Sequence, residues 1–262
     1  MTSTYRVSGA PKVHADKCGL RSVKTRASAS SLVGAGWPLV CASCAIIVAY
    51  HIMEEANPKT WRKTMEAARI IWTRKVLRKK DYILAVQTIR NGLMAATFFC
   101  SMTIALLTAA LGALFEGSGS STALSMAPEP LFSPATALQL PYIKLALLAT
   151  VLAISSAAFA QACRYLMHAS FIFLVVADDP AIEEPSQTEL KNEQSPLTVP
   201  TGSAERLMVI AERWWWGGLR GMYITLPLIT WMASGTVGFL VASVLLVWIL
   251  SILDKPLTNT VA

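Results

Sequence analysis

Long uncharged apolar blocks dominate the pattern of hydrophobic and polar positions in this chain. Residues 32–52, 92–115 and 222–253 contain no formal charge, and residues 140–177 contain only Lys144 and Arg164. About twenty residues in a helix, rising 1.5 Å each, cross a hydrocarbon core of roughly 30 Å. An unpaired backbone group in hydrocarbon costs several kcal/mol, so such segments must be helical. Each block therefore predicts a transmembrane helix.

The pattern predicts an all-α fold: an integral membrane four-helix bundle within a domain of residues 32–254. We expect the spans at about 32–52, 92–115, 143–174 and 222–250. The fourth block is longer than one crossing requires, which predicts tilt, a kink near Pro227 or an interfacial start. Small residues that favour close helix approach are Gly235 and Gly238, and Ala153, Ser156, Ala157 and Ala160. The alternative is that these residues form no packing face, because alanine and serine are common in membrane spans.

Composition agrees with a membrane protein. Of 262 residues, 54% are hydrophobic and 15% charged, with a mean hydropathy of +0.48. This balance excludes a soluble enzyme domain, a disordered protein and a disulfide scaffold. The formal charge of +7 indicates contact with anionic lipid heads rather than nucleic acid, because no nucleic-acid-binding module accompanies it.

The loop charges predict the topology. Residues 53–91 carry ten Lys and Arg, residues 116–139 none and residues 178–221 four. By the positive-inside rule the first and third loops lie inside, while the second loop and both chain ends lie outside. The basic tail, residues 1–31, conflicts with this scheme. Its Ser, Thr and Ala content is typical of an organellar address, for a mitochondrial inner or plastid membrane; a disordered basic tail is the alternative.

The first inner loop predicts an amphipathic helix on the membrane surface. Asn57 and Pro58 form a helix start, and Trp61, Met65 and Trp72 then recur at helical spacing. The residues expected to bind anionic lipid heads are Arg62, Lys63, Arg69, Lys75, Arg78, Lys79 and Lys80. The alternative is a solvated basic helix that only sets topology.

The second inner loop has two parts. Residues 178–204 are rich in acids and prolines and predict a flexible loop. Three tryptophans then precede the fourth span, and we expect Trp214, Trp215 and Trp216 to anchor the headgroup layer. A carbohydrate or quinone platform is the less favoured reading of the same triplet.

Catalytic motifs are missing from the sequence. Cys41 and Cys44 match C-x-x-C but lie inside an apolar span without a second pair, and the three histidines lack metal-ligand spacing. We therefore expect no metal, no cofactor and no enzymatic activity. Polar residues instead gather near the predicted inner ends of the spans, and they form the candidate polar cluster: Gln87, Arg90, Asn91, Arg164, His168, Arg220 and Tyr223. Structural anchoring by snorkelling is the alternative.

The run Leu84-Ala85-Val86-Gln87-Thr88-Ile89-Arg90-Asn91, followed by Met94-Ala95-Ala96-Thr97, resembles the signature of the domain of unknown function 599 family. Later parts are similar too, at Lys144, Phe159 and Arg164, and at Arg220, Tyr223, Leu226-Pro227-Leu228 and Trp231. The resemblance covers roughly residues 36–254. It implies four membrane helices and no established activity.

These observations favour a membrane scaffold or accessory subunit without chemistry. Its expected partners are anionic lipids and either other membrane subunits or further copies of the chain. The alternative is a small transporter or channel component that uses the candidate polar cluster. A membrane enzyme is the third and weakest hypothesis.

Overall fold

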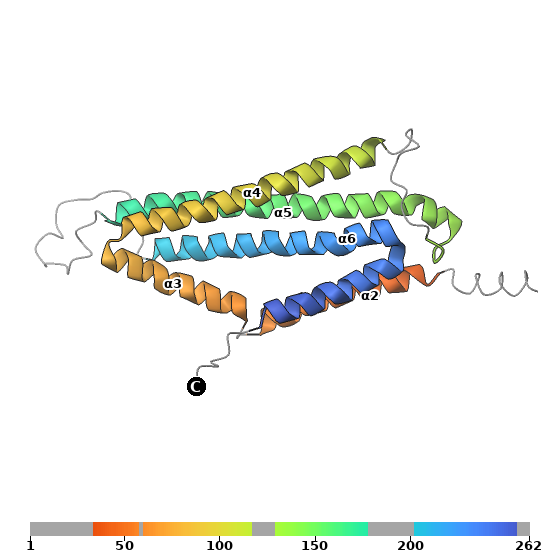
Figure 1. Cartoon of the computed structure of the whole chain (residues 1–262), viewed down its shortest axis with the longest axis horizontal. Helices are drawn as coiled ribbons and strands as arrows, with labels where there is room; N and C mark the ends of the chain where they lie inside the picture. Colours follow the sequence, from red (N-terminus) through yellow and green to blue (C-terminus); the bar gives the residue numbers. More distant parts are fainter. Residues whose placement is uncertain (1–33, 58–59, 117–128, 178–201, 256–262) are drawn as a thin grey trace, which may run out of the picture.

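The described part of the chain is all helical. The computed structural model describes residues 34–57, 60–116, 129–177 and 202–255, and these contain helices without strands (Figure 1). The helices are α2 (Gly36–Ala56), α3 (Trp61–Lys79), α4 (Tyr82–Glu116), α5 (Pro134–Ala177) and α6 (Ser203–Leu253). All but α3 are long and apolar enough to cross a membrane, which confirms the predicted all-α membrane fold. The basic tail and most of the acidic loop lie outside the described residues.

The connection between α3 and α4 is a tight turn. Thr60 caps the start of α3 by accepting a hydrogen bond from the Lys63 amide at 3.5 Å. The helix ends at Lys79 and is capped by Lys80, whose φ of 51° is left-handed. Asp81 then accepts from the Leu84 amide at 3.2 Å and starts α4. Helix α4 therefore begins about ten residues before its apolar block.

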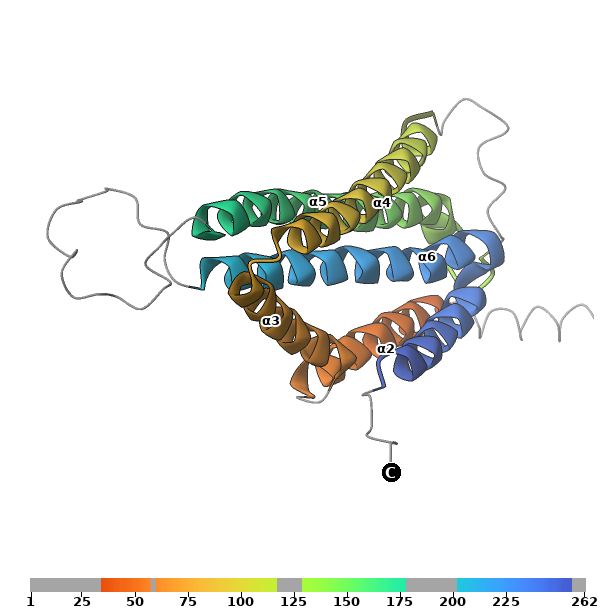
Figure 2. The same ribbon diagram turned by 60° about the vertical axis from the view of Figure 1, so that its left-hand side comes forward.

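Helix α6 folds back on itself at Gly235. This residue has φ 76° and ψ −173°, and it divides the helix into arm 1 (203–234) and arm 2 (236–253). In one straight helix Arg220 and Asp254 would lie about 51 Å apart, yet their side chains approach to 3.7 Å. Figures 1 and 2 show arm 2 running back beside α2. The expected kink near Pro227 is thus a reversal at Gly235, while Pro227 stays buried within arm 1.

The fold-back places the described chain ends at opposite ends of the layer that α2 and arm 2 form. At the turn end, where α6 reverses, the Gly34 amide donates to the Leu131 carbonyl at 3.0 Å. At the other end, the basic end, Tyr50 donates to Asp254 at 2.5 Å. The expectation that both chain ends lie on one side is therefore wrong for the described residues. Its cause is that residues 222–253 contain the last part of arm 1 and all of the antiparallel arm 2, which alone is about 27 Å long.

The apolar core has two parts. Near the turn end, α5 and both arms of α6 bury a cluster that includes Leu152, Trp231 and Phe239. Nearer the start of arm 1, α3 joins α4, α5 and arm 1 in a second cluster that includes Val76 and Phe173. Helix α3 is thus partly built into the protein rather than resting only on a membrane surface.

Close approach of α5 and α6 occurs at glycines other than those expected. A Cβ atom at Gly218 would lie 2.7 Å from the Phe159 ring, and one at Gly221 would lie 2.0 Å from Ser155 Oγ. Ser156 is buried between α4 and α5 and donates to Thr103 at 2.9 Å. The three alanines of the proposed packing face, at 153, 157 and 160, are exposed.

Candidate functional site

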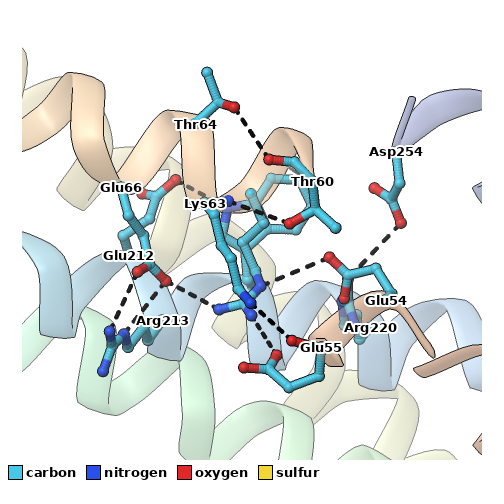
Figure 3. Close-up of polar contacts among 12 residues, drawn as sticks. Glu54, Glu55, Thr60, Lys63, Thr64, Glu66, Glu212, Arg213, Arg220 and Asp254 are labelled. Carbon is cyan, nitrogen blue, oxygen red and sulfur yellow. Dashed lines mark hydrogen bonds and ion pairs between the residues drawn. The ribbon is translucent and has the colours of Figure 1, made fainter. Parts of the chain in front are cut away.

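Charged side chains from distant parts of the sequence meet at the basic end. Glu54 lies near the end of α2, Arg220 lies in arm 1, and Asp254 follows arm 2. The Arg220 guanidinium lies 2.5 Å from a Glu54 oxygen and 3.7 Å from an Asp254 oxygen (Figure 3). The Glu54 side chain is only 4% exposed. A buried carboxylate is stable only when it is paired, so Arg220 and its neighbours hold this charge in place.

The start of α3 joins the same network. Arg62 lies 3.7 Å from Glu54 and 2.9 Å from Glu66, and it also contacts Glu55. Lys63 Nζ donates to the Glu55 carbonyl at 2.7 Å. These contacts fix the start of α3 against the end of α2. We call Glu54, Arg62, Glu66, Arg220 and Asp254 the basic-end network.

Ion pairs also fasten α3 along arm 1. Arg69 lies 2.6 Å from Glu212, and Arg74 lies 3.5 Å from Glu205. Arg213 on arm 1 pairs in turn with Glu66 at 3.2 Å. Within the predicted lipid-binding set, Arg62 and Arg69 therefore face carboxylates of the protein, and Lys63 bonds α2. Four members of this set lie on the exposed surface: Lys75, Arg78, Lys79 and Lys80.

A pocket of about 240 Å³ opens beside the basic-end network. Three aromatic side chains line it: Trp61 from α3, and Trp216 and Tyr223 from arm 1. The charged walls are Arg220 and Asp254, and arm 2 contributes Leu250 and Leu253. Aromatic, charged and aliphatic surfaces therefore share one cavity at this end of the bundle.

The three predicted interfacial tryptophans have different surroundings. Trp214 is 41% exposed. Trp215 packs between Phe99 and Phe159, with ring centroids 5.4 Å from each. Trp216 donates from its indole nitrogen to Glu212 at 3.0 Å. One tryptophan is thus open to the surroundings, while the other two contribute to the helix packing and the pocket.

The candidate polar cluster does not assemble. Gln87, Arg90, Asn91, Arg164 and His168 are all exposed. No hydrogen bond or ion pair links any of these five to another residue among the described ranges, so the expectation that polar partners hold Arg90 and Arg164 is wrong there. The reason is helix orientation. Helix α4 buries Ala85, Ile89 and Ala96, and the polar residues lie on its other faces. Only Arg220 and Tyr223 share a site, the pocket described above.

A second buried ion pair stabilises the turn end. Lys144 on α5 contacts Glu129 at 2.5 Å, and their side chains are 1% and 6% exposed. Lys144 also donates to the Trp231 carbonyl at 3.1 Å and lies 5.1 Å from the Trp231 ring centroid. Glu129 accepts from the Thr236 amide at 3.2 Å and from the Trp231 indole at 3.1 Å. We call Glu129, Lys144, Trp231 and Thr236 the turn-end cluster.

The turn-end cluster matches the electrostatics of a broken helix. Arm 1 ends near Trp231, where the helix dipole is negative, and Lys144 lies there. Arm 2 begins at Thr236, where the first backbone amides have no acceptor within the helix and the dipole is positive. Glu129 lies there and accepts from the Thr236 amide. Sequence reasoning did not identify Glu129. The available signal was Lys144, a lone charge in an apolar block that requires a counter-ion.

The described contacts of these sites are ion pairs, hydrogen bonds and aromatic packing. Across the described residues, no group of three or more His, Cys, Asp and Glu side chains is placed to hold a metal ion. Four of the five cysteines are described, and all four are free thiols. The fold and its two charged clusters define a helical multi-pass membrane protein.

The chain belongs to the family described as "Protein of unknown function, DUF599", whose model matches residues 38–256. This match confirms the resemblance seen in the run from Leu84 to Thr97. No curated protein and no solved structure matches the chain.

Proposed function

We propose that this protein is a membrane scaffold or accessory subunit that assembles laterally with other membrane helices and performs no chemistry of its own. The observation that carries the proposal is an uncovered stripe of small residues on α5: Ala146, Thr150, Ala153, Ala157 and Ala160. These residues recur every three or four positions, so they share one face, and all are exposed. Small residues allow the close backbone approach on which helix association in membranes depends.

The polar groups of the membrane helices support the same role. Thr103 and Thr150 donate to carbonyls four residues earlier in their own helices, at 2.9 Å and 2.8 Å. Glu129 is paired with Lys144 and Glu54 with Arg220. The two ion pairs hold separate segments together, and all of these groups are occupied rather than open to a passing substrate. The arrangement therefore favours a rigid assembly surface over a transport pathway.

The experiment tests the stripe directly. Ala157→Leu places a larger side chain on the uncovered face, while Ile154→Leu changes the shape of a neighbouring side chain that is 64% exposed. Each tagged variant is extracted in mild detergent and its assembly measured by native mass analysis. We expect the unaltered chain and Ile154→Leu to co-purify with larger membrane subunits, and Ala157→Leu to lose them. Identical masses for all three would contradict the proposal, and a small homo-oligomer would favour the transporter or channel alternative.

The exposed end of α3 supports a contact with anionic lipid heads. Each basic residue near an anionic leaflet contributes about 1 kcal/mol of binding. Replacing Arg78, Lys79 and Lys80 with Gln should weaken binding of the reconstituted protein to anionic vesicles, and less so at high salt. Equal affinity for neutral and anionic vesicles would contradict this part.

The basic tail supports an organellar membrane as the location. Its residues lie outside the described structure, so this inference depends on composition alone. A fluorescent protein fused behind residues 1–31 should reach mitochondria or plastids. Cytosolic or secretory fluorescence would contradict the assignment.

A further inference from the structure

The pocket at the basic end combines aromatic, charged and aliphatic side chains. Its walls come from three segments: the start of α3, the middle of arm 1 and the end of arm 2. Trp61, Trp216 and Tyr223 provide aromatic surface, while Arg220 and Asp254 provide one charge of each sign. A pocket with this lining fits a ligand that carries both charges and has an apolar attachment.

The charges at the pocket are balanced, which argues against a purely anionic ligand. Arg220 is already close to Glu54, at 2.5 Å, and its contact with Asp254 is looser, at 3.7 Å. An anion that approached Arg220 would also meet the Asp254 carboxylate in the same wall. A zwitterion avoids this repulsion, because its negative group can face Arg220 while its positive group faces Asp254.

The aromatic lining indicates which positive group fits. Quaternary ammonium groups are recognised by the faces of Trp and Tyr rings, where the ring quadrupole attracts a cation that is weakly hydrated. Two tryptophans and a tyrosine line this one pocket. A phosphate near Arg220 with a trimethylammonium near the rings corresponds to a phosphocholine group.

The depth of the pocket identifies the source of that group. Asp254 follows arm 2, about 27 Å from the turn at Gly235, which places the pocket near the edge of a hydrocarbon core of roughly 30 Å. Leu250 and Leu253 line its apolar side. Lipid headgroups occupy this level, and an acyl chain could continue along arm 2. We propose that the pocket binds the headgroup of a phosphocholine lipid.

The test uses the full chain in detergent, stripped of lipid by washing. Native mass spectrometry measures binding of phosphatidylcholine, phosphatidylglycerol with the same acyl chains, and free phosphocholine. We expect phosphatidylcholine to bind at least several-fold better than the other two. Free phosphocholine binding equally well would overturn the lipid assignment, and equal or tighter binding of phosphatidylglycerol would overturn the zwitterion assignment.

Variants separate recognition from folding. Trp61→Leu should weaken phosphatidylcholine binding about tenfold, while Trp214→Leu, which removes an exposed tryptophan outside the pocket lining, should leave it unchanged. Asp254→Asn should reduce the preference for phosphatidylcholine over phosphatidylglycerol, a ratio that general loosening of the fold would not shift selectively. Equal effects of Trp61→Leu and Trp214→Leu, or an unchanged ratio in Asp254→Asn, would overturn the proposal.

Discussion

Removal of the Glu129 carboxylate tests the turn-end cluster. In Glu129→Ala the Lys144 ammonium, only 1% exposed in its side chain, would lose its counter-ion and be left buried among apolar residues. Breaking a buried pair in this way costs about 3–5 kcal/mol of unfolding free energy. Loss of the cap on the Thr236 amide adds about 1 kcal/mol. The variant should therefore lose much of the stability of a typical domain.

Further variants separate the contribution of the ion pair to the unfolding free energy from that of the amide cap. Glu129→Gln retains an oxygen for Thr236 but removes the charge, so it should recover the cap and not the ion pair. The double variant Glu129→Ala, Lys144→Met should be more stable than Glu129→Ala alone, because no unpaired charge remains. Unfolding is followed by tryptophan fluorescence during titration of mixed micelles with sodium dodecyl sulfate.

A matched control is Glu205→Ala, which breaks an ion pair whose Arg74 side chain is 65% exposed. Exposed pairs contribute about 0–1 kcal/mol, so this variant should unfold almost like the unaltered chain. If Glu129→Ala and Glu205→Ala unfold alike, or if adding Lys144→Met gives no recovery, the buried pair does not stabilise the turn as argued.

Two more predictions concern the reversal in α6. Gly235→Ala should cost about 1–3 kcal/mol in the same titration, because a φ of 76° with a ψ of −173° is accessible essentially to glycine alone. Gly217→Ala, at a helical position with open space around it, should instead gain about 0.5–1 kcal/mol, so equal effects at the two glycines would contradict the backbone argument. In a cysteine-free background, cysteines placed at Lys255 and Lys79 should be labelled from one side of oriented vesicles and a cysteine at Ser133 from the other; labelling of Lys255 and Ser133 from the same side would refute the fold-back.

The sequence predicted the membrane helices well because a backbone in hydrocarbon has few alternatives to helix. It did not predict the turn at Gly235, since no charged residue interrupts residues 222–253 and a glycine in a span is more often a packing position. The pairing of Glu54 with Arg220 also escaped prediction, because it depends on which distant segments meet. The prediction grouped Arg90 and Arg164 because both lie near the same predicted ends of their spans. Position along a span does not indicate which face of the helix points into the bundle.

The reversal of α6 bears on how the chain enters the membrane during synthesis. If residues 222–253 crossed once as a straight helix, the charges of Asp254 and Lys255 would have to be carried through the hydrocarbon, at about 2.5–3.5 kcal/mol each on insertion scales. Inserted as a hairpin, the segment leads with the uncharged stretch around Gly235, and both flanking charged regions stay where they were made. Glu129 and Lys144, which contact the residues beside the turn, precede α6 in the sequence and are therefore synthesised before it. Helix α6 can therefore enter the membrane as a hairpin whose turn binds the ion pair of Glu129 and Lys144.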